Sequence, residues 1–160
     1  MKKVILCFAT LLLIVAACKP NCNPKVPKGV QPIDWENYND VYTVHWNYTM
    51  DCSNAPLGRT GQTIKMYGWI FHPQTVSFWD FSLLSDSLFV ESNNPKCAMV
   101  RVQCFNREEF DSIQAKFNAA DRTKKCYVTG ELGVSALAGN DCCTTSPDIF
   151  IDKADDIYFE

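Results

Sequence analysis

Apolar and polar residues alternate with a period of two in several stretches after residue 60, and this feature limits the fold more than any other. The clearest stretch is QTIKMYGWIF, residues 62–71, whose even-numbered positions from Ile64 to Ile70 carry Ile, Met, Gly and Ile. Successive side chains of a β-strand point to opposite faces, so the pattern predicts a strand with one buried face. We expect His72-Pro73 to end this strand.

The same alternation predicts further strands in residues 77–86, 96–105 and 124–132, and residues 148–160 predict one more strand and a short terminal one. One helix interrupts the series. Asn106 with Glu109 three residues later has the pattern of an N-cap and capping box, and apolar residues then recur at helical spacing. A helix is therefore expected over about 107–119, and the order is β-β-β-α-β-β.

Residues 41–50 fit two patterns at once. Tyr42, Val44, Trp46, Tyr48 and Met50 alternate with polar residues, whereas Trp35, Tyr38, Tyr42 and Trp46 fall at helical spacing. Because Thr, Val, Asn and Tyr are poor helix formers, the composition favours an extra N-terminal strand segment.

The order and lengths of these elements, over about residues 61–160, resemble the OB-fold, a small five-stranded barrel with its helix between strands three and four. Gly68 in MYGWI and Gly130 in VTGEL stand where strands of such a barrel bend, since glycine permits strong coiling. The resemblance implies a mainly β (α+β) fold.

The N-terminus has the composition of an export signal. Residues 1–17 join a basic start to an uncharged apolar run, which is too short to span a membrane because a spanning helix needs about 20 apolar residues. Val15-Ala16-Ala17-Cys18 resembles the lipobox of bacterial lipoproteins, and the resemblance implies a lipid on Cys18. The proline-rich residues 18–33 then form the lipidated N-terminus and tether, and residues 34–160 form one OB-like domain with its core in 61–160.

The resemblance to lipoproteins also implies a location. Lys19 follows Cys18 where retained inner-membrane lipoproteins typically carry Asp, which favours the outer membrane, and no acidic cluster follows, which favours the periplasmic leaflet over the cell surface. Loss of residues 1–17 removes two lysines and no acid from a chain of net charge −3. An acidic chain without a basic stripe predicts no nucleic-acid partner.

Residues for chemistry are scarce. His45 and His72 are the two histidines, and neither stands in a recognisable triad or metal motif, so we expect no enzyme, no metal and no cofactor. The candidate binding face is the aromatic row of Tyr67, Trp69 and Phe71, with His72 or Trp79 beside the following turn. Large exposed apolar faces are uncommon, which favours the alternative that the N-terminal segment covers this row as a second core.

Export places the cysteines in an oxidising compartment, where disulfides are expected. Cys104 and Cys126 fall on apolar strand faces and are expected as buried thiols. The disulfide candidates are Cys52, Cys97, Cys142 and Cys143. We expect at least one bridge from the Cys142-Cys143 pair to Cys52 or Cys97.

Three functions remain open. The first is a membrane-anchored, non-catalytic binding or adaptor module that contacts envelope protein or glycan. The second is a purely structural envelope component. The third, which the absence of a C-x-x-C motif disfavours, is a thiol or metal protein that uses Cys142-Cys143.

Overall fold

The secondary structure is dominated by strands. The computed structural model describes residues 26–50, 57–75, 79–84, 98–121, 123–138 and 143–160. The elements are β1 (Asn39–Asp40), α2 (Val41–Tyr48), β2 (Gly58–Thr75), β3 (Trp79–Leu84), β4 (Met99–Cys104), η3 (Arg107–Glu109), α3 (Phe110–Ala119), β5 (Cys126–Ala138), β6 (Cys143–Ile151), η4 (Ala154–Asp156) and β7 (Ile157–Phe159).

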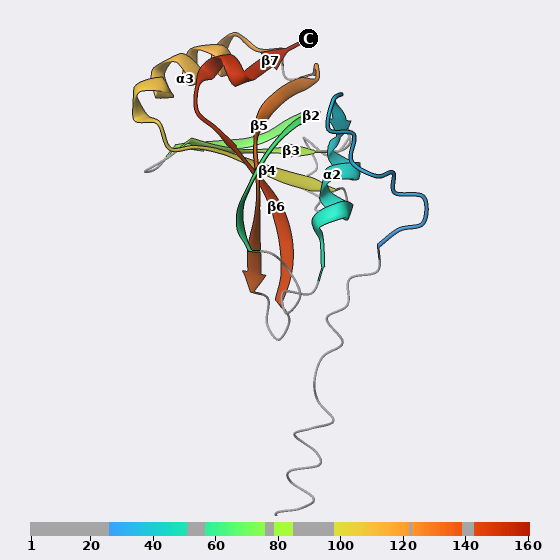
Figure 1. Ribbon diagram of the computed structural model, residues 1–160. Helices are drawn as coiled ribbons and strands as arrows, with labels where there is room; N and C mark the ends of the chain where they lie inside the picture. Colours follow the sequence, from blue (N-terminus) through green and yellow to red (C-terminus); the bar gives the residue numbers. More distant parts are fainter. Residues whose placement is uncertain (1–25, 51–56, 76–78, 85–97, 122, 139–142) are drawn as a thin grey trace, which may run out of the picture.

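Five of the strands close into a barrel (Figure 1). Their order is β2-β3-β4-β6-β5, and β5 pairs back onto β2. The β4–β6 pair is parallel, and the other pairs of the barrel are antiparallel. A closed barrel of this order, with its helix between the third and fourth strands, is OB-like and mainly β, so the predicted fold class is confirmed.

Strand β2 reaches both neighbours because it is long and bends. Its first part pairs with β5 and its second part with β3. The predicted end at His72-Pro73 is wrong, since β2 continues to Thr75 across a register shift between Phe71 and Gln74. A proline donates no ladder hydrogen bond, and an irregularity of this kind accommodates it.

The barrel interior is built from the faces that the alternation predicted. Each predicted inward face places its apolar side chains in one continuous core, which contains Ile64, Met66, Ile70, Phe81, Leu83, Ala98, Val100, Val102, Cys104, Cys126, Val128 and Leu132. The thiols of Cys104 and Cys126 are free and buried, as expected. Burial raises the pKa of both thiols, so they stay protonated and unreactive.

Helix α3 covers one end of the barrel. The ring of Phe117 packs edge-on against Phe81, with ring centroids 4.7 Å apart. The Asn106 side chain caps the preceding turn by accepting from the Glu108 N–H. The predicted capping box does not form, because the Glu109 carboxylate instead accepts from the N–H of Ala154 at 2.9 Å and so ties the helix to η4.

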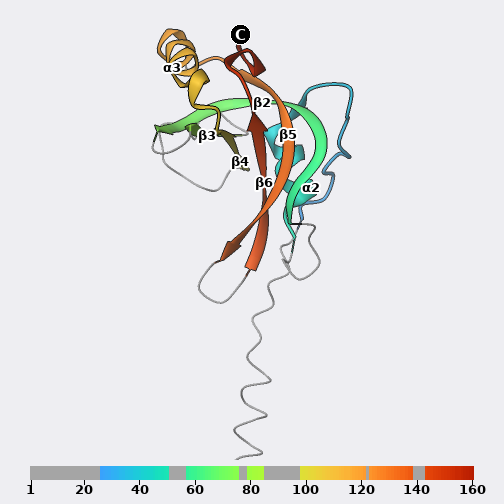
Figure 2. The same cartoon turned by 60° about the vertical axis from the view of Figure 1, so that its left-hand side comes forward.

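Helix α2 lies on the opposite side of the barrel from α3 (Figures 1 and 2), and it replaces the strand predicted from residue 41. The Asp40 carboxylate caps it by accepting from the Thr43 N–H at 2.6 Å, and Val41 and Val44 are fully buried in the core. An N-cap contributes about 1 kcal/mol, and tertiary burial supplies most of a helix's stability, so together they outweigh the low intrinsic propensities. The helical interpretation is therefore correct for residues 41–48, whereas Trp35 and Tyr38 of the predicted helical spacing lie before the helix.

The end of the predicted tether packs on the domain. The Asn47 side chain donates to the Gln31 carbonyl at 2.7 Å, and Ile33 packs against the core. Residues 31–33 thus contact the domain that is predicted to begin at residue 34.

Several predictions concern positions outside the described residues: the leader 1–17, the lipidation site Cys18, and the disulfide candidates Cys52, Cys97 and Cys142. The side chain of Cys143 also lies outside them, although its backbone begins β6. Within the described part of the chain, none of the helices has the length and apolar character needed to cross a membrane.

Candidate binding surface

A row of three tyrosines crosses the outer face of the barrel. Tyr67 of β2 is in register with Tyr127 of β5, and Tyr127 is in register with Tyr158 of β7. The ring centroids are 5.6 Å apart for the first pair and 5.9 Å for the second. Neighbours in the sequence such as Met66 and Val128 are fully buried, so strand alternation turns these three side chains outward. We call Tyr67, Tyr127 and Tyr158 the tyrosine row.

Further side chains extend the tyrosine row. The ring of Tyr38 stands edge-on to Tyr127, with centroids 5.2 Å apart. The Lys125 ammonium lies 4.7 Å from the centre of the Tyr67 ring and 5.8 Å from that of Trp69. A cation over an aromatic face is attracted by the ring quadrupole, so Lys125 helps to hold these two rings in place.

This face is partly exposed. Tyr38 is 44% exposed and Tyr158 is 63% exposed, while Tyr67, Trp69 and Phe71 are each partly buried. The N-terminal segment lies along one side of the face, where Tyr38 contacts Tyr127 and the residues before α2 adjoin Tyr67. The alternative of a second core under this segment stays a prediction. The side chains of His72 and Trp79 lie outside the described residues.

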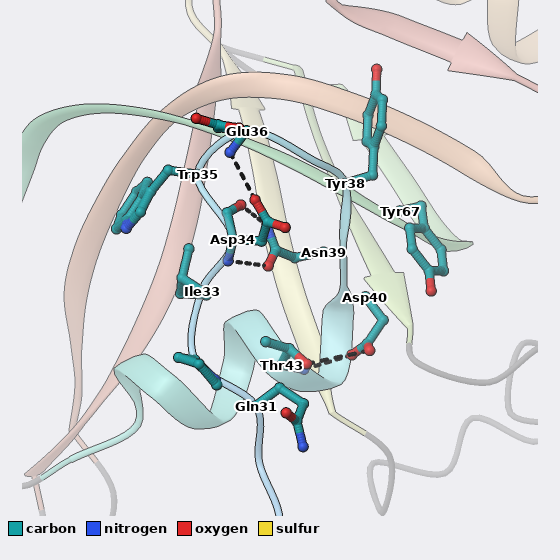
Figure 3. Close-up of a pocket in the computed structure, with 11 residues that line it drawn as sticks. Gln31, Ile33, Asp34, Trp35, Glu36, Tyr38, Asn39, Asp40, Thr43 and Tyr67 are labelled. Carbon is teal, nitrogen blue, oxygen red and sulfur yellow. Dashed lines mark hydrogen bonds between the residues drawn. The ribbon is translucent and has the colours of Figure 1, made fainter.

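A cleft of about 680 Å³ adjoins the tyrosine row at Tyr67. The segment 31–43 forms most of its wall, so we call it the 31–43 cleft. Figure 3 shows Trp35 on one side, Tyr38 and Tyr67 on the other, and Asp34 and Asn39 between them. Its lining residues are Gln31, Pro32, Ile33, Asp34, Trp35, Glu36, Tyr38, Asn39, Asp40, Thr43 and Tyr67.

Hydrogen bonds fix the wall of the cleft. The Asp34 carboxylate accepts from the backbone N–H groups of Glu36 and Asn37 at 2.9 and 3.0 Å and from the Asn37 side chain at 3.0 Å. The Asn37 side chain is the main cause that lowers the pKa of Asp34, with the two N–H groups adding to it, so this carboxylate is ionised at neutral pH.

Asn39 joins the wall to the barrel. Its side chain is almost buried and donates to the Asp34 carbonyl at 2.7 Å and to the Lys65 carbonyl of β2 at 3.2 Å. Its side-chain oxygen accepts from the Asp34 N–H at 2.9 Å. The cleft is therefore shaped before any ligand arrives, which lowers the ordering cost of binding.

The surface offers aromatic faces and hydrogen-bond acceptors rather than a reactive pair. Among the described residues, no group of three or more His, Cys, Asp or Glu side chains is arranged to hold a metal ion. His45 lies away from the cleft, with its Nδ1 2.8 Å from the Met99 carbonyl, and burial lowers the pKa of its imidazole.

The sequence pointed to only part of this surface. Tyr67 and Trp69 were predicted to lie on it, whereas Tyr38, Tyr127, Tyr158 and Lys125 were missed. Alternation in 124–132 places Tyr127 opposite the apolar positions, and this signal could have found it. The register that aligns β2, β5 and β7 has no local signature.

Comparisons with known proteins give a likeness of fold only. No family model and no curated protein matches the chain. Three similar solved structures are a Plasmodium falciparum SSB in complex with ssDNA (15% identity, TM-score 0.40), the OBody AM3L09 bound to hen egg-white lysozyme (18%, 0.41), and the Saccharomyces cerevisiae mitochondrial single-stranded DNA-binding protein Rim1 (12%, 0.41). In the same order, the matched regions cover 61%, 62% and 61% of this chain and 93%, 81% and 92% of the other chain.

One prediction is corrected by these comparisons. Nucleic acid was set aside as a partner because the chain is acidic. Two of the three structures are single-stranded DNA-binding proteins, so the exclusion of nucleic acid does not stand. At TM-scores of 0.40 and 0.41 the likeness assigns no ligand to this chain.

Proposed function

We propose that this protein is a non-catalytic binding module of the cell envelope, anchored to the outer membrane by a lipid on Cys18. Its binding surface is the tyrosine row together with the adjoining 31–43 cleft. The observation that carries the proposal is the alignment of three outward tyrosines from three different strands. Tyr67 lines the cleft, and Tyr127 contacts Tyr38 in the wall of the cleft.

Physical reasoning supports a binding role for this face. A tyrosine presents a large, rigid apolar face with a polar tip, and it loses little conformational entropy on binding. Four tyrosines gather here, Tyr38, Tyr67, Tyr127 and Tyr158, of which Tyr158 and Tyr38 are the most exposed. Exposing them to water has no benefit for the folded monomer, so a partner accounts for them best.

In this barrel, a ligand can bind on the outer face but not in the interior. Its described interior is filled by fully buried side chains, and α2 and α3 lie over its two ends. The proposed function therefore needs no opening of the fold, and the module binds as a rigid body.

The anchor rests on the lipobox-like sequence at residues 15–18. Metabolic labelling with an alkyne fatty acid should tag the wild-type protein. The Cys18→Ser variant should carry no label and should accumulate as a longer precursor. Equal labelling of the two proteins would refute the lipid anchor. It would not bear on the binding surface, which needs an experiment of its own.

The binding surface is tested by photo-crosslinking in cells that express the full chain. A benzophenone amino acid replaces Tyr158, which is 63% exposed in the tyrosine row, or Tyr42, which is 38% exposed on α2 and serves as the matched control. We expect an adduct upon irradiation at position 158 and none at position 42. Equal adducts at both positions, or none at either, would refute a specific surface and favour a purely structural envelope component.

A further inference from the structure

We infer that the ligand of this surface is a neutral, hydroxyl-rich saccharide chain that lies along the tyrosine row and inserts a sugar unit into the 31–43 cleft. This inference rests on the proposed function and names its ligand class. It is argued from the continuity of the two parts, from their charges and from the acceptors that remain available.

The row and the cleft form one continuous surface. Tyr67 belongs to the tyrosine row and also lines the cleft. Tyr38 lines the cleft and touches Tyr127 of the row edge-on. Three adjacent strands place the rings over a width of roughly 10 Å, which is two strand spacings. An extended ligand can therefore contact the row and reach the cleft at the same time.

The charges on this surface are mixed. Asp34, Glu36 and Asp40 line the cleft, whereas Lys65 and Lys125 lie on the β2–β5 face beside the rings. A polyanion would meet the carboxylates of the cleft, and a polycation would meet the two ammonium groups. Like charges brought together at an interface cost affinity. A neutral ligand avoids both penalties.

Hydroxyl groups match the polar atoms that the surface presents. The Lys65 ammonium donates to the Glu36 carbonyl at 3.0 Å, and an ammonium group has three donors, so two remain for a ligand. The Glu36 carboxylate accepts no hydrogen bond from the residues that the structure describes, and it remains an acceptor at the cleft. A hydroxyl both donates and accepts, so a sugar can satisfy both kinds of group.

The aromatic rings supply the apolar part of the match. Rings of Trp35, Tyr38 and Tyr67 surround the polar floor formed by Asp34 and Asn39 (Figure 3). A small number of fixed polar groups among aromatic walls is the usual composition of a small-molecule site. A sugar ring presents C–H groups on its faces and hydroxyls at its edge, which corresponds to this arrangement.

The test is isothermal titration calorimetry of the full-length lipidated protein in detergent micelles. The neutral probes are cellohexaose, maltohexaose and mannohexaose, and the charged comparators are hexagalacturonate and hexalysine. We expect at least one neutral hexasaccharide to bind saturably and the charged comparators to bind more weakly or not at all.

Variants locate the site. Trp35→Ala and Tyr38→Ala remove two rings that are each 44% exposed, and both should weaken the neutral probe by about tenfold or more. Tyr42→Ala removes a ring of similar exposure outside the cleft and should bind like the wild type. Melting temperatures of the three variants show that folding is retained.

Three results would overturn the inference. The first is tighter binding of a charged comparator than of any neutral probe, and the second is the absence of binding by every neutral probe. The third is unchanged affinity of Trp35→Ala and Tyr38→Ala. None of these results bears on the crosslink at position 158, so an adduct there that contains protein would preserve the proposed function and assign the surface to a protein partner.

Discussion

The contact between Thr145 and the end of α2 allows a direct test of how the N-terminal segment is joined to the barrel. Thr145 of β6 is 1% exposed. Its hydroxyl donates to the Tyr48 carbonyl, at the last residue of α2, and accepts from the Met50 N–H at 3.0 Å. Its own N–H donates to the Met50 carbonyl at 2.8 Å. Replacing Thr145 by Val keeps the shape of the side chain and removes the hydroxyl alone.

The expected cost follows from the two backbone groups that lose their partner. A buried donor or acceptor left unpaired costs about 1–3 kcal/mol, and the Met50 N–H and the Tyr48 carbonyl are two such groups. The added methyl group recovers up to about 0.8 kcal/mol. We therefore expect Thr145→Val to lower the free energy of unfolding by about 1–5 kcal/mol.

The assay is equilibrium unfolding in urea, followed by circular dichroism, with Thr144→Val as the matched control. Thr144 is the preceding residue of β6 and is partly exposed, so its substitution should change stability by less than about 0.5 kcal/mol. The slope of the transition should be the same for both variants. A Thr145→Val variant as stable as Thr144→Val would show that α2 is not fastened to β6 in this way.

Three further predictions concern two glycines of the barrel, the buried His45, and the Cys142-Cys143 pair. A Cβ at Gly130 would lie 2.6 Å from the backbone oxygen of Phe150, whereas a Cβ at Gly133 would meet only the Phe150 ring, which can turn aside. In urea unfolding, Gly130→Ala should therefore lower the free energy of unfolding by about 1–3 kcal/mol, and Gly133→Ala should lower it by less. Burial lowers the pKa of His45 from its ordinary value of 6.5, so the unfolded chain binds more protons than the folded chain near that pH. The melting temperature should therefore fall as pH decreases from 7 to 5, and the His45→Asn variant should show a smaller fall. Mass spectrometry of unreduced, alkylated protein should find at least one of Cys142-Cys143 in a disulfide, and alkylation of both would refute this.

The strands were predictable because each carries its own local signal. In β4, for example, Val100, Val102 and Cys104 alternate with Met99, Arg101 and Gln103, and the apolar core face follows from six residues of sequence, although Gln103 on the other face is also buried. Such a signal does not depend on which strand lies beside it. The OB-like order then follows from the number and sequence of strands around one helix.

Helix α2 was not predictable from local pattern. The same residues satisfy a period of two and a helical period, and intrinsic propensities favour the strand. The contacts that decide the outcome come from distant parts of the chain: Thr145 binds its C-terminal end, and Met99 meets His45. Stabilisation by contacts this far away in sequence leaves no trace in residues 41–50 themselves.

In the binding surface, too, the features with a local sequence signal were predictable and those set by tertiary packing were not. Tyr67 and Trp69 were placed on one outward face because alternation within β2 is local. The alignment of Tyr127 and Tyr158 with Tyr67 depends on the registers of two strand pairs, and registers are set by tertiary packing. The cleft depends in addition on Asn39, whose side chain joins the 31–43 segment to β2.

The position of the surface relative to the proposed anchor adds a constraint on its ligand. Gln31 lines the cleft, and the segment from Cys18 to Gln31 can extend by at most about 45 Å, because an extended residue spans about 3.3–3.6 Å. A lipid on Cys18 would hold the cleft within this distance of the membrane surface. Confinement to such a layer raises the effective concentration of the module toward ligands that are fixed in the same layer, so modest affinity is sufficient for lasting contact. A shallow aromatic surface with mixed charge fits that requirement better than it fits the capture of a dilute soluble ligand, which would need a deep, enclosed pocket.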